Sequence, residues 1–184
     1  MIPLIIVIIV VVILVGYVIV AYNGLVRSKN QIENAWSQID VQLKRRIDLI
    51  PNLVETVKGY AAHERETLEA VIAARNSPIA APDTPTAQAE AHTVLTGALR
   101  QLVSLGEAYP DLKAIQNFLA LQEELTATEG RVAYSRQFYN DCVLTYDNKL
   151  ESFPTVIIAK MFNFEPKEYF EAEDQARVAP TVEF

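Results

Sequence analysis

The first 22 residues, 1–22, read MIPLIIVIIVVVILVGYVIVAY, and 16 of them are Ile, Val or Leu. The first charged residue is Arg27. A helix of 22 residues is about 33 Å long, enough to cross a hydrocarbon core of about 30 Å. Its insertion is favourable by roughly 5–10 kcal/mol, and a lone strand in lipid could not satisfy its backbone hydrogen bonds. We therefore predict a membrane-spanning anchor over residues 1–22.

The alternative for this run is a cleaved secretory signal. No basic side chain precedes the run, its apolar part exceeds the about 7–15 residues of a signal, and no Ala-X-Ala pattern directly follows it. We therefore expect the anchor to be retained. Arg27 and Lys29 follow the run, so the positive-inside rule predicts a single pass with the N-terminus outside and the C-terminal body in the cytoplasm. A body on the other side of the membrane is the alternative.

The body carries helical periodicity. Apolar residues recur at steps of three and four over 23–75, 87–107 and 112–151, which predicts three long helices. Pro51 falls inside the first, which we interpret as one kinked helix, with two helices and a tight turn as the alternative. The first helix would continue straight from the anchor. Its predicted apolar stripe is Ile32, Trp36, Ile39, Leu43, Ile47, Ile50, Val54, Val57, Ala61, Leu68 and Ile72.

Turn signals separate these helices. Residues 76–86 contain three prolines and predict a loop, and the 108–111 turn places Asp111 where it could cap the next helix. The predicted stripe of 87–107 is Val94, Leu95, Leu99, Leu102 and Leu105. A short amphipathic helix over 155–162 would follow. The predicted fold is therefore all-α: an N-terminal transmembrane helix (1–22), a long-helix up-down antiparallel bundle (23–165) and an acidic C-terminal tail (166–184).

The helix over 112–151 has a seam whose period approaches 3.5 residues, which is typical of coiled-coil-like packing. Glu129 and Arg136 lie on this seam, and buried charges require partners. We expect these partners on the first long helix, for example Arg46 or Asp48. The seam residues are Ile115, Phe118, Gln122, Leu125, Glu129, Val132, Arg136, Tyr139, Val143, Tyr146 and Leu150.

Composition argues against several functions. The formal net charge is −7, which disfavours nucleic-acid binding through phosphates. One cysteine and two histidines are too few for a four-ligand structural zinc site. The stretch from His63 to Glu66 resembles a zinc-protease helix, but Thr67 stands where the second histidine is needed. Cys142 has no neighbour in sequence that would lower its pKa. We therefore predict no catalytic residue, no metal ligand and no cofactor-binding residue.

Several charged or aromatic groups have a functional and a structural interpretation. The basic triplet 44–46 could bind anionic lipid, but it lies about 33 Å along a helix from the anchor, and we favour a solvated face with one inward arginine. We expect Trp36 in the core, and in solvent the carboxylates Glu123, Glu124, Glu171, Glu173 and Asp174. Tyr169 and Phe170 are candidates for a partner-contact strip, with packing on the bundle as the equal alternative.

Two long stretches, Tyr22–Arg75 and Tyr109–Phe164, carry a set of specific motifs. They are NAWSQID (34–40), Arg45-Arg46, DLIPNL (48–53), Tyr109-Pro110, Asn117-Phe118, Thr128-Glu129, Arg136, Tyr139-Asn140 and Phe153-Pro154. With these motifs the chain resembles the LemA family of bacterial membrane proteins over about 22–170. Asn163 departs from the family pattern, which usually has Gly there.

The resemblance implies an anchored helical bundle in a bacterial inner membrane and supplies no accepted enzymatic activity. Our leading hypothesis is a non-enzymatic scaffold of the cell envelope that assembles with itself as a homo-oligomer and binds other envelope membrane proteins. One alternative is a membrane-shaping or lipid-binding protein. Another is an accessory subunit of a membrane protease or chaperone system.

Overall fold

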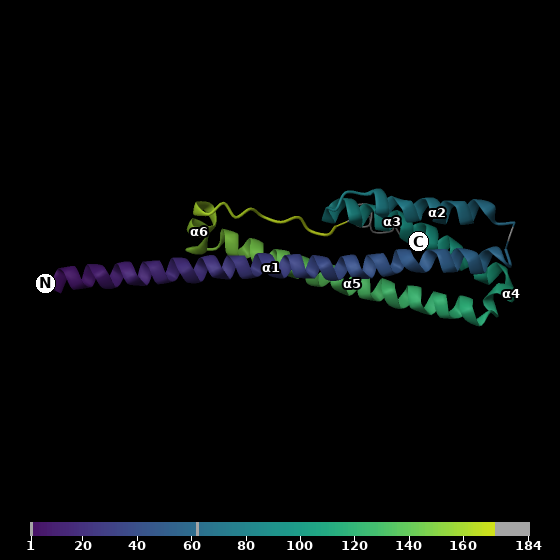
Figure 1. Ribbon diagram of the computed structural model, residues 1–184, viewed down its shortest axis with the longest axis horizontal. Coiled ribbons are helices and arrows are strands. Elements are labelled where there is room, and N and C mark those ends of the chain that lie inside the picture. Colours follow the sequence, from purple (N-terminus) through teal and green to yellow (C-terminus); the bar gives the residue numbers. More distant parts are fainter. Residues whose placement is uncertain (1, 62, 172–184) are drawn as a thin grey trace, which may run out of the picture. The chain divides into compact units, whose positions relative to one another are not determined.

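The computed structural model describes residues 2–61 and 63–171, and within them it contains six helices and no strand. The predicted all-α class is confirmed. The helices, coloured along the sequence in Figure 1, are α1 (Ile2–Lys58), α2 (Arg65–Ala80), α3 (Pro85–Ala108), α4 (Pro110–Lys113), α5 (Gln116–Glu151) and α6 (Thr155–Met161).

Helix α1 runs without a break from the apolar run through Pro51 to Lys58, as predicted. It contains a stretch that is long and apolar enough to cross a membrane. The predicted continuation to residue 75 is wrong, because α1 ends at Lys58 and α2 starts at Arg65. Gly59, a poor helix former, follows the last helical residue, and the amides of Tyr60 and Ala61 both bond to the Val57 carbonyl.

The predicted loop over 76–86 is also shorter than expected. Helix α2 extends to Ala80 and includes Pro78, so that only 81–84 are non-helical. A helix leaves its last carbonyls without partners, and Gln88 supplies one. Its Nε2 donates to the carbonyls of Pro78, Ala81 and Pro82, at 3.2, 3.4 and 3.3 Å.

Thr84 and Pro85 start α3 in the usual way. Proline occupies the first helical position, where its missing N–H is no loss, and the Thr84 hydroxyl accepts from the Ala87 amide at 3.4 Å. Our expectation for Asp111 is wrong. It lies inside the short α4, one residue after Pro110, and α5 begins only at Gln116.

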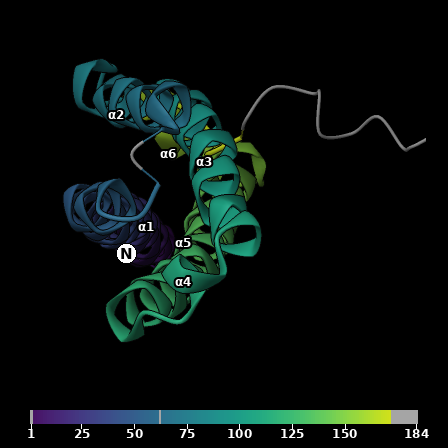
Figure 2. The same ribbon diagram turned by 90° about the vertical axis from the view of Figure 1, so that its right-hand side faces the viewer.

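The described chain divides into two compact units, residues 2–37 with 137–168 and residues 38–136 with 169–171. In the second unit, viewed end-on in Figure 2, α2 and α3 lie side by side, and α1 and α5 lie on the lower side of that view. Their inward side chains form one core: Ile50, Leu53, Val54, Val57, Ala61, Leu68, Val71, Ala74, Leu95, Leu99, Leu102, Leu112, Phe118 and Leu125.

In the first unit α1 and α5 run antiparallel. The Trp36 ring packs against Tyr139 with centroids 5.6 Å apart and planes inclined by 59°, and Lys149 Nζ donates to the Ser28 hydroxyl at 2.6 Å. Trp36 is thus partly buried against α5. The seam predicted for α5 is largely correct, because Tyr139, Val143, Tyr146 and Leu150 are all buried.

Two stripe residues face the wrong way. Ile72 and Val94 are exposed, whereas Leu68 and Leu95 are buried as predicted, and Val71, which the predicted stripe omits, is also buried. On α2 the buried face therefore runs through Leu68 and Val71, so that Ile72, one residue further, lies at its exposed edge.

Gly106 allows α3 to approach α5 closely. A Cβ at this position would lie 2.7 Å from Cε1 of the buried Phe118 ring, whereas a Cβ at Gly97 on the same helix would meet no atom within 4 Å. We expect Gly106→Ala to destabilise the protein by about 1–2 kcal/mol, because overpacking outweighs the gain in helix propensity. Gly97→Ala should stabilise it by about 0.5–1 kcal/mol. Urea denaturation of the full chain in detergent, followed by circular dichroism, checks both, and equal stability of the two variants would contradict this account.

Candidate functional site

The basic triplet 44–46 places one arginine inside the second unit. Lys44 and Arg45 are exposed, whereas Arg46 is 4% exposed, as expected for three successive residues that fan around a helix. Arg45 forms an ion pair with Glu124 at 2.5 Å. Glu124 is therefore partly covered, and only Glu123 of the two carboxylates faces solvent as predicted.

Arg46 lies at the start of a polar chain between α1 and α3. Its Nη1 donates to the Thr96 hydroxyl at 2.9 Å, and that hydroxyl donates to the His92 carbonyl at 2.7 Å. Burial lowers the pKa of Arg46, the carboxylate of Glu129 opposes this shift, and the nearby charge of Arg100 adds to it. Arginine nevertheless stays protonated in proteins, so a positive charge lies inside the bundle.

Glu129 and Arg136 do not behave as the seam pattern predicted. Glu129 is half-buried and forms its ion pair with Arg100, at 3.6 Å, while Asp48 is exposed. Arg136 is exposed and places its guanidinium 5.2 Å from the centroid of the Phe170 ring. The prediction that these two side chains form ion pairs with residues of α1 is therefore wrong. Glu129 influences Arg46 only through its charge.

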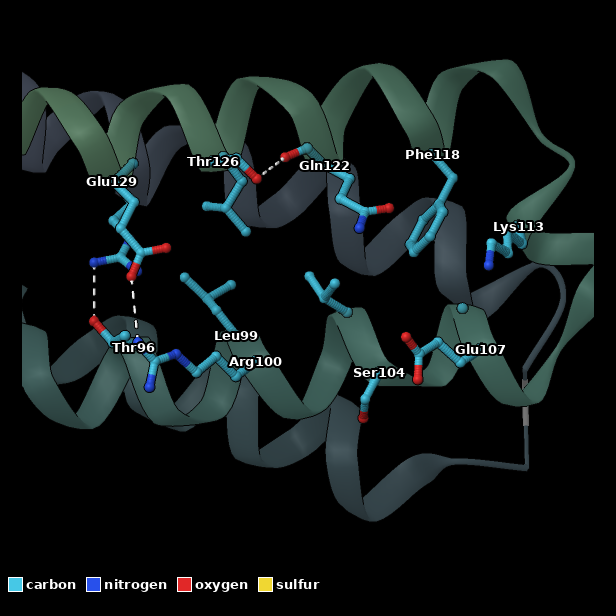
Figure 3. A pocket seen from close by; sticks show the side chains of 14 residues that line it. Thr96, Leu99, Arg100, Ser104, Glu107, Lys113, Phe118, Gln122, Thr126 and Glu129 are labelled. Atoms are coloured by element: carbon cyan, nitrogen blue, oxygen red, sulfur yellow. Dashed lines mark hydrogen bonds and ion pairs between the residues drawn. The ribbon is translucent and has the colours of Figure 1, made fainter. Parts of the chain in front are cut away.

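We call Arg46, Thr96, Arg100 and Glu129 the polar cluster. All four line a cavity of about 330 Å³ between α3 and α5 (Figure 3). Its charged lining is mixed, with cations at Arg46, Arg100 and Lys113 and carboxylates at Glu107 and Glu129. The remaining lining residues are Thr96, Leu99, Val103, Ser104, Gly106, Phe118, Gln122, Leu125 and Thr126.

Several polar groups of this cavity pair with one another or with the backbone. Its hydroxyls are already engaged, since Thr126 donates to the Gln122 carbonyl at 2.9 Å and Ser104 to the Gln101 carbonyl at 2.7 Å. No histidine or cysteine lines it. Each of these two hydroxyls therefore donates to a backbone carbonyl of its own helix and not to a carboxylate.

His92 lines a second cavity of about 300 Å³, together with Asp40, Asp48 and Arg75. The side chain is 5% exposed, and neither ring nitrogen has a hydrogen-bond partner among the residues described. Burial, aided by the charge of Arg46, lowers the pKa of His92 to about 4. His92 is therefore a neutral core residue at neutral pH.

The other residues considered for chemistry are separate from this cluster. His63 is exposed in the link between α1 and α2, and Cys142 is buried in α5. Burial raises the pKa of the Cys142 thiol, with a further contribution from Asp141, which disfavours the reactive thiolate. Across residues 2–61 and 63–171, no group of three or more His, Cys, Asp or Glu could hold a metal ion.

Two tyrosines of α5 hold the segment that follows α6. Tyr139 and Tyr146 donate to the carbonyls of Glu168 and Glu165, at 2.8 and 3.1 Å. Phe170 is buried, so of the two alternatives for the tail aromatics the structure has packing on the bundle. We call residues 163–170 the strap. It was not predicted from the sequence, although a buried tyrosine indicates that its hydroxyl has a hydrogen-bond partner. Of the tail carboxylates, Glu171 is exposed, and Glu173 and Asp174 lie outside the described residues.

Tyr139 offers a test of the strap. Burial raises the pKa of Tyr139 to about 12, assisted by Glu168 and Asp147. Tyr139→Phe removes the bond to Glu168, so we expect a loss of about 1 kcal/mol and faster hydrogen exchange over residues 163–170. Tyr134→Phe is the matched control, because Tyr134 is exposed on the same helix. Unchanged exchange in Tyr139→Phe would show that the strap does not depend on this bond.

Comparison with known proteins identifies the family. A sequence model described as the LemA family matches residues 35–184. The chain belongs to the LemA family. Several of its family motifs are structural: Arg46 anchors the polar chain, and the Tyr109 hydroxyl donates to Glu64 at 2.8 Å, which ties the end of α3 to the start of α2.

Among individual relatives, the chain is 27% identical over 156 residues to protein LemA of Metamycoplasma hominis, covering 85% of this chain and 71% of that protein. It is 23% identical to magnetosome protein MamQ 2 of Paramagnetospirillum magneticum, covering 85% and 67%. It is also 23% identical to magnetosome protein MamQ of Magnetospirillum gryphiswaldense, covering 88% and 70%. This LemA-family chain is therefore a membrane-associated helical protein.

Proposed function

We propose that this LemA-family chain is a non-enzymatic, membrane-anchored scaffold of the bacterial cell envelope that assembles with itself. One observation carries the proposal: α1 continues without interruption from the apolar run into the helical body, from Ile2 to Lys58. Such a helix fixes the body to the membrane without a flexible linker. The engaged hydroxyls and the neutral, buried His92 support a structural role for the polar cluster.

The proposed anchor crosses the inner membrane once, with the body in the cytoplasm. Arg27 and Lys29, which follow the apolar run, support this orientation. In a Cys142→Ser background, a cysteine placed at the exposed Tyr134 tests it. We expect an impermeant maleimide to leave this cysteine unlabelled in spheroplasts and to label it once the membrane is opened. Labelling of intact spheroplasts would place the body outside.

Self-assembly is supported by apolar side chains that the fold leaves in solvent. Ile72 and Ile79, seven residues apart on α2, are 42% and 59% exposed. Positions seven apart lie on one side of a helix, and tethering to a membrane raises the effective concentration of such a face. Neighbouring copies could bury it by lateral contact.

Disulfide crosslinking in native membranes tests the assembly. We expect Ile79→Cys in a Cys142→Ser background to crosslink into dimers or larger species, and the full chain to elute as an oligomer in mild detergent. Asp111→Cys, at an exposed position in α4, is the control for random collision. A monomer in detergent, together with equal crosslinking at 79 and 111, would overturn the self-assembly proposal.

A lipid-binding or membrane-shaping role is the second candidate, and the apolar side chains around α6 favour it. Phe153, Ile157 and Met161 are all exposed. Two of the relatives are named as magnetosome proteins. If shaping is the function, purified full-length chain should deform vesicles into which it is reconstituted, seen by electron microscopy. Vesicles that stay spherical at high protein density would exclude it.

A further inference from the structure

Helix α6 is apolar on two opposite sides. Ile158 and Ala159 are buried against the first unit, yet Ile157 and Met161 point outward, at 55% and 57% exposure. Phe153, four residues before Ile157, is 81% exposed. A helix that is hydrophobic all round is normally covered on all sides. We call Ile157 and Met161, four residues apart on α6, together with Phe153 in the turn before it, the outer face of α6.

This helix lies beside the last part of the apolar run of α1. The hydroxyls of Tyr17 and Thr155 are 3.4 Å apart, and the Tyr22 ring packs on Phe162 and Phe164 with centroids 4.8 and 5.6 Å away. Figure 1 shows α6 next to α1, at the end of α5. These contacts fix the level of α6 along the membrane helix.

That level corresponds to the boundary between lipid and water. Tyr17 and Tyr22 are separated by about 7.5 Å along the helix axis, comparable to the about 5–10 Å depth at which interfacial helices lie. Tyrosine rings favour this layer. If residues 1–22 cross the hydrocarbon core, Tyr22 lies at its edge and Tyr17 about 7.5 Å inside it, so the outer face of α6 meets the headgroups and upper acyl chains of the same leaflet.

The charges around the outer face fit this location. Lys160 is the one charged residue in the α6 sequence, and it is exposed beside Ile157 and Met161. A lysine can lie along apolar surface and extend its ammonium group to the phosphate level. On the inner side, Lys149 is held by its hydrogen bond to Ser28.

We propose that the outer face of α6 is embedded in the interfacial layer of the membrane that α1 crosses. The occupant of this face is lipid, because the contacts of Tyr17 and Tyr22 hold α6 beside the end of the apolar run of α1, at the level where that run leaves the membrane. The protein then has two membrane attachments, the spanning helix and a second helix that lies at the surface. This inference rests on the proposed anchor.

Spin labels on the full chain can locate each part. In a Cys142→Ser background, single cysteines replace Ile157 or Met161 in α6, Val12 in the apolar run and Val41 in the body part of α1. Val41 is exposed and lies about 29 Å beyond Tyr22 along the helix, so it reports on water. The chain is reconstituted into phosphatidylcholine–phosphatidylglycerol vesicles. Collision with oxygen, which enriches in lipid, is compared with collision with a water-soluble nickel complex.

We expect the oxygen-to-nickel collision ratio at 157 and 161 to exceed that at 41 by at least threefold and to be lower than that at 12. A lipid-like ratio at 12 with a water-like ratio at 157 and 161 would overturn the inference while the anchor stands. A water-like ratio at 12 would overturn the anchor and the inference together. Protection of 157 and 161 from both reagents would mean that protein covers the face, which also overturns the inference.

Discussion

A variant that lacks residues 2–16 is expected to leave the membrane fraction when membranes are washed with alkaline carbonate, whereas the full chain stays in it. The deletion removes 13 of the 16 Ile, Val and Leu residues of the run and with them most of the roughly 5–10 kcal/mol of insertion free energy. It keeps Tyr17 and Tyr22, so the contacts with Thr155, Phe162 and Phe164 remain.

Immunoblotting of pellet and supernatant measures the release. The matched control replaces residues 2–16 by an alternating Leu-Ala stretch of equal length, which restores an apolar helix without the native sequence and should restore resistance to carbonate. The shortened chain should still bind vesicles weakly at neutral pH through the outer face of α6. Retention of the shortened chain after the wash would show that the run is not the membrane anchor.

Acidification from pH 7.5 to 5 is expected to destabilise the protein by about 2 kcal/mol through His92. Burial and the charge of Arg46 lower the pKa of His92 from 6.5 to about 4 in the folded chain. Below pH 6.5 the unfolded chain therefore binds a proton that the folded chain does not. The stabilising contribution is complete above pH 6.5 and is lost as the pH falls toward 4.

The difference between wild type and His92→Leu isolates this contribution from that of the carboxylates. Urea denaturation in detergent at several pH values should show the wild type losing stability relative to His92→Leu as the pH falls. His63→Leu is the control, because His63 is exposed in the link between α1 and α2. A wild-type curve parallel to that of His92→Leu would mean that His92 is protonated inside the bundle.

The long apolar stripes could be predicted from the sequence because the buried face of a helix repeats over many turns. The stripe of α5 predicted Val132, Tyr139, Val143 and Tyr146 correctly as buried. The positions at which helices end were harder to predict. A helix end depends on side chains outside the helix, as when the Gln88 amide donates to the carbonyls of Pro78, Ala81 and Pro82 where α2 ends.

The polar cluster was predictable in part for the same reason. Helix geometry indicates that one residue of 44–46 points inward, but not that its hydrogen-bond partner is Thr96 on α3. Glu129 shared the seam with buried residues yet pairs with Arg100, which no period in the sequence marks as its neighbour. Pairing across helices depends on their rotation and offset, and a single sequence does not encode these as a pattern.

If the apolar run is the membrane anchor, as proposed, the length of α1 has a mechanical consequence. From Tyr22 to Lys58 the helix extends about 54 Å beyond the apolar run, with no break at Pro51. Helices in lipid change tilt when the bilayer thins or thickens. A tilt of about 10° would displace the distal tip of a stiff rod of this length by about 9 Å. In the proposed orientation the helix would act as a lever that converts small changes in bilayer thickness into larger lateral displacements of its distal end.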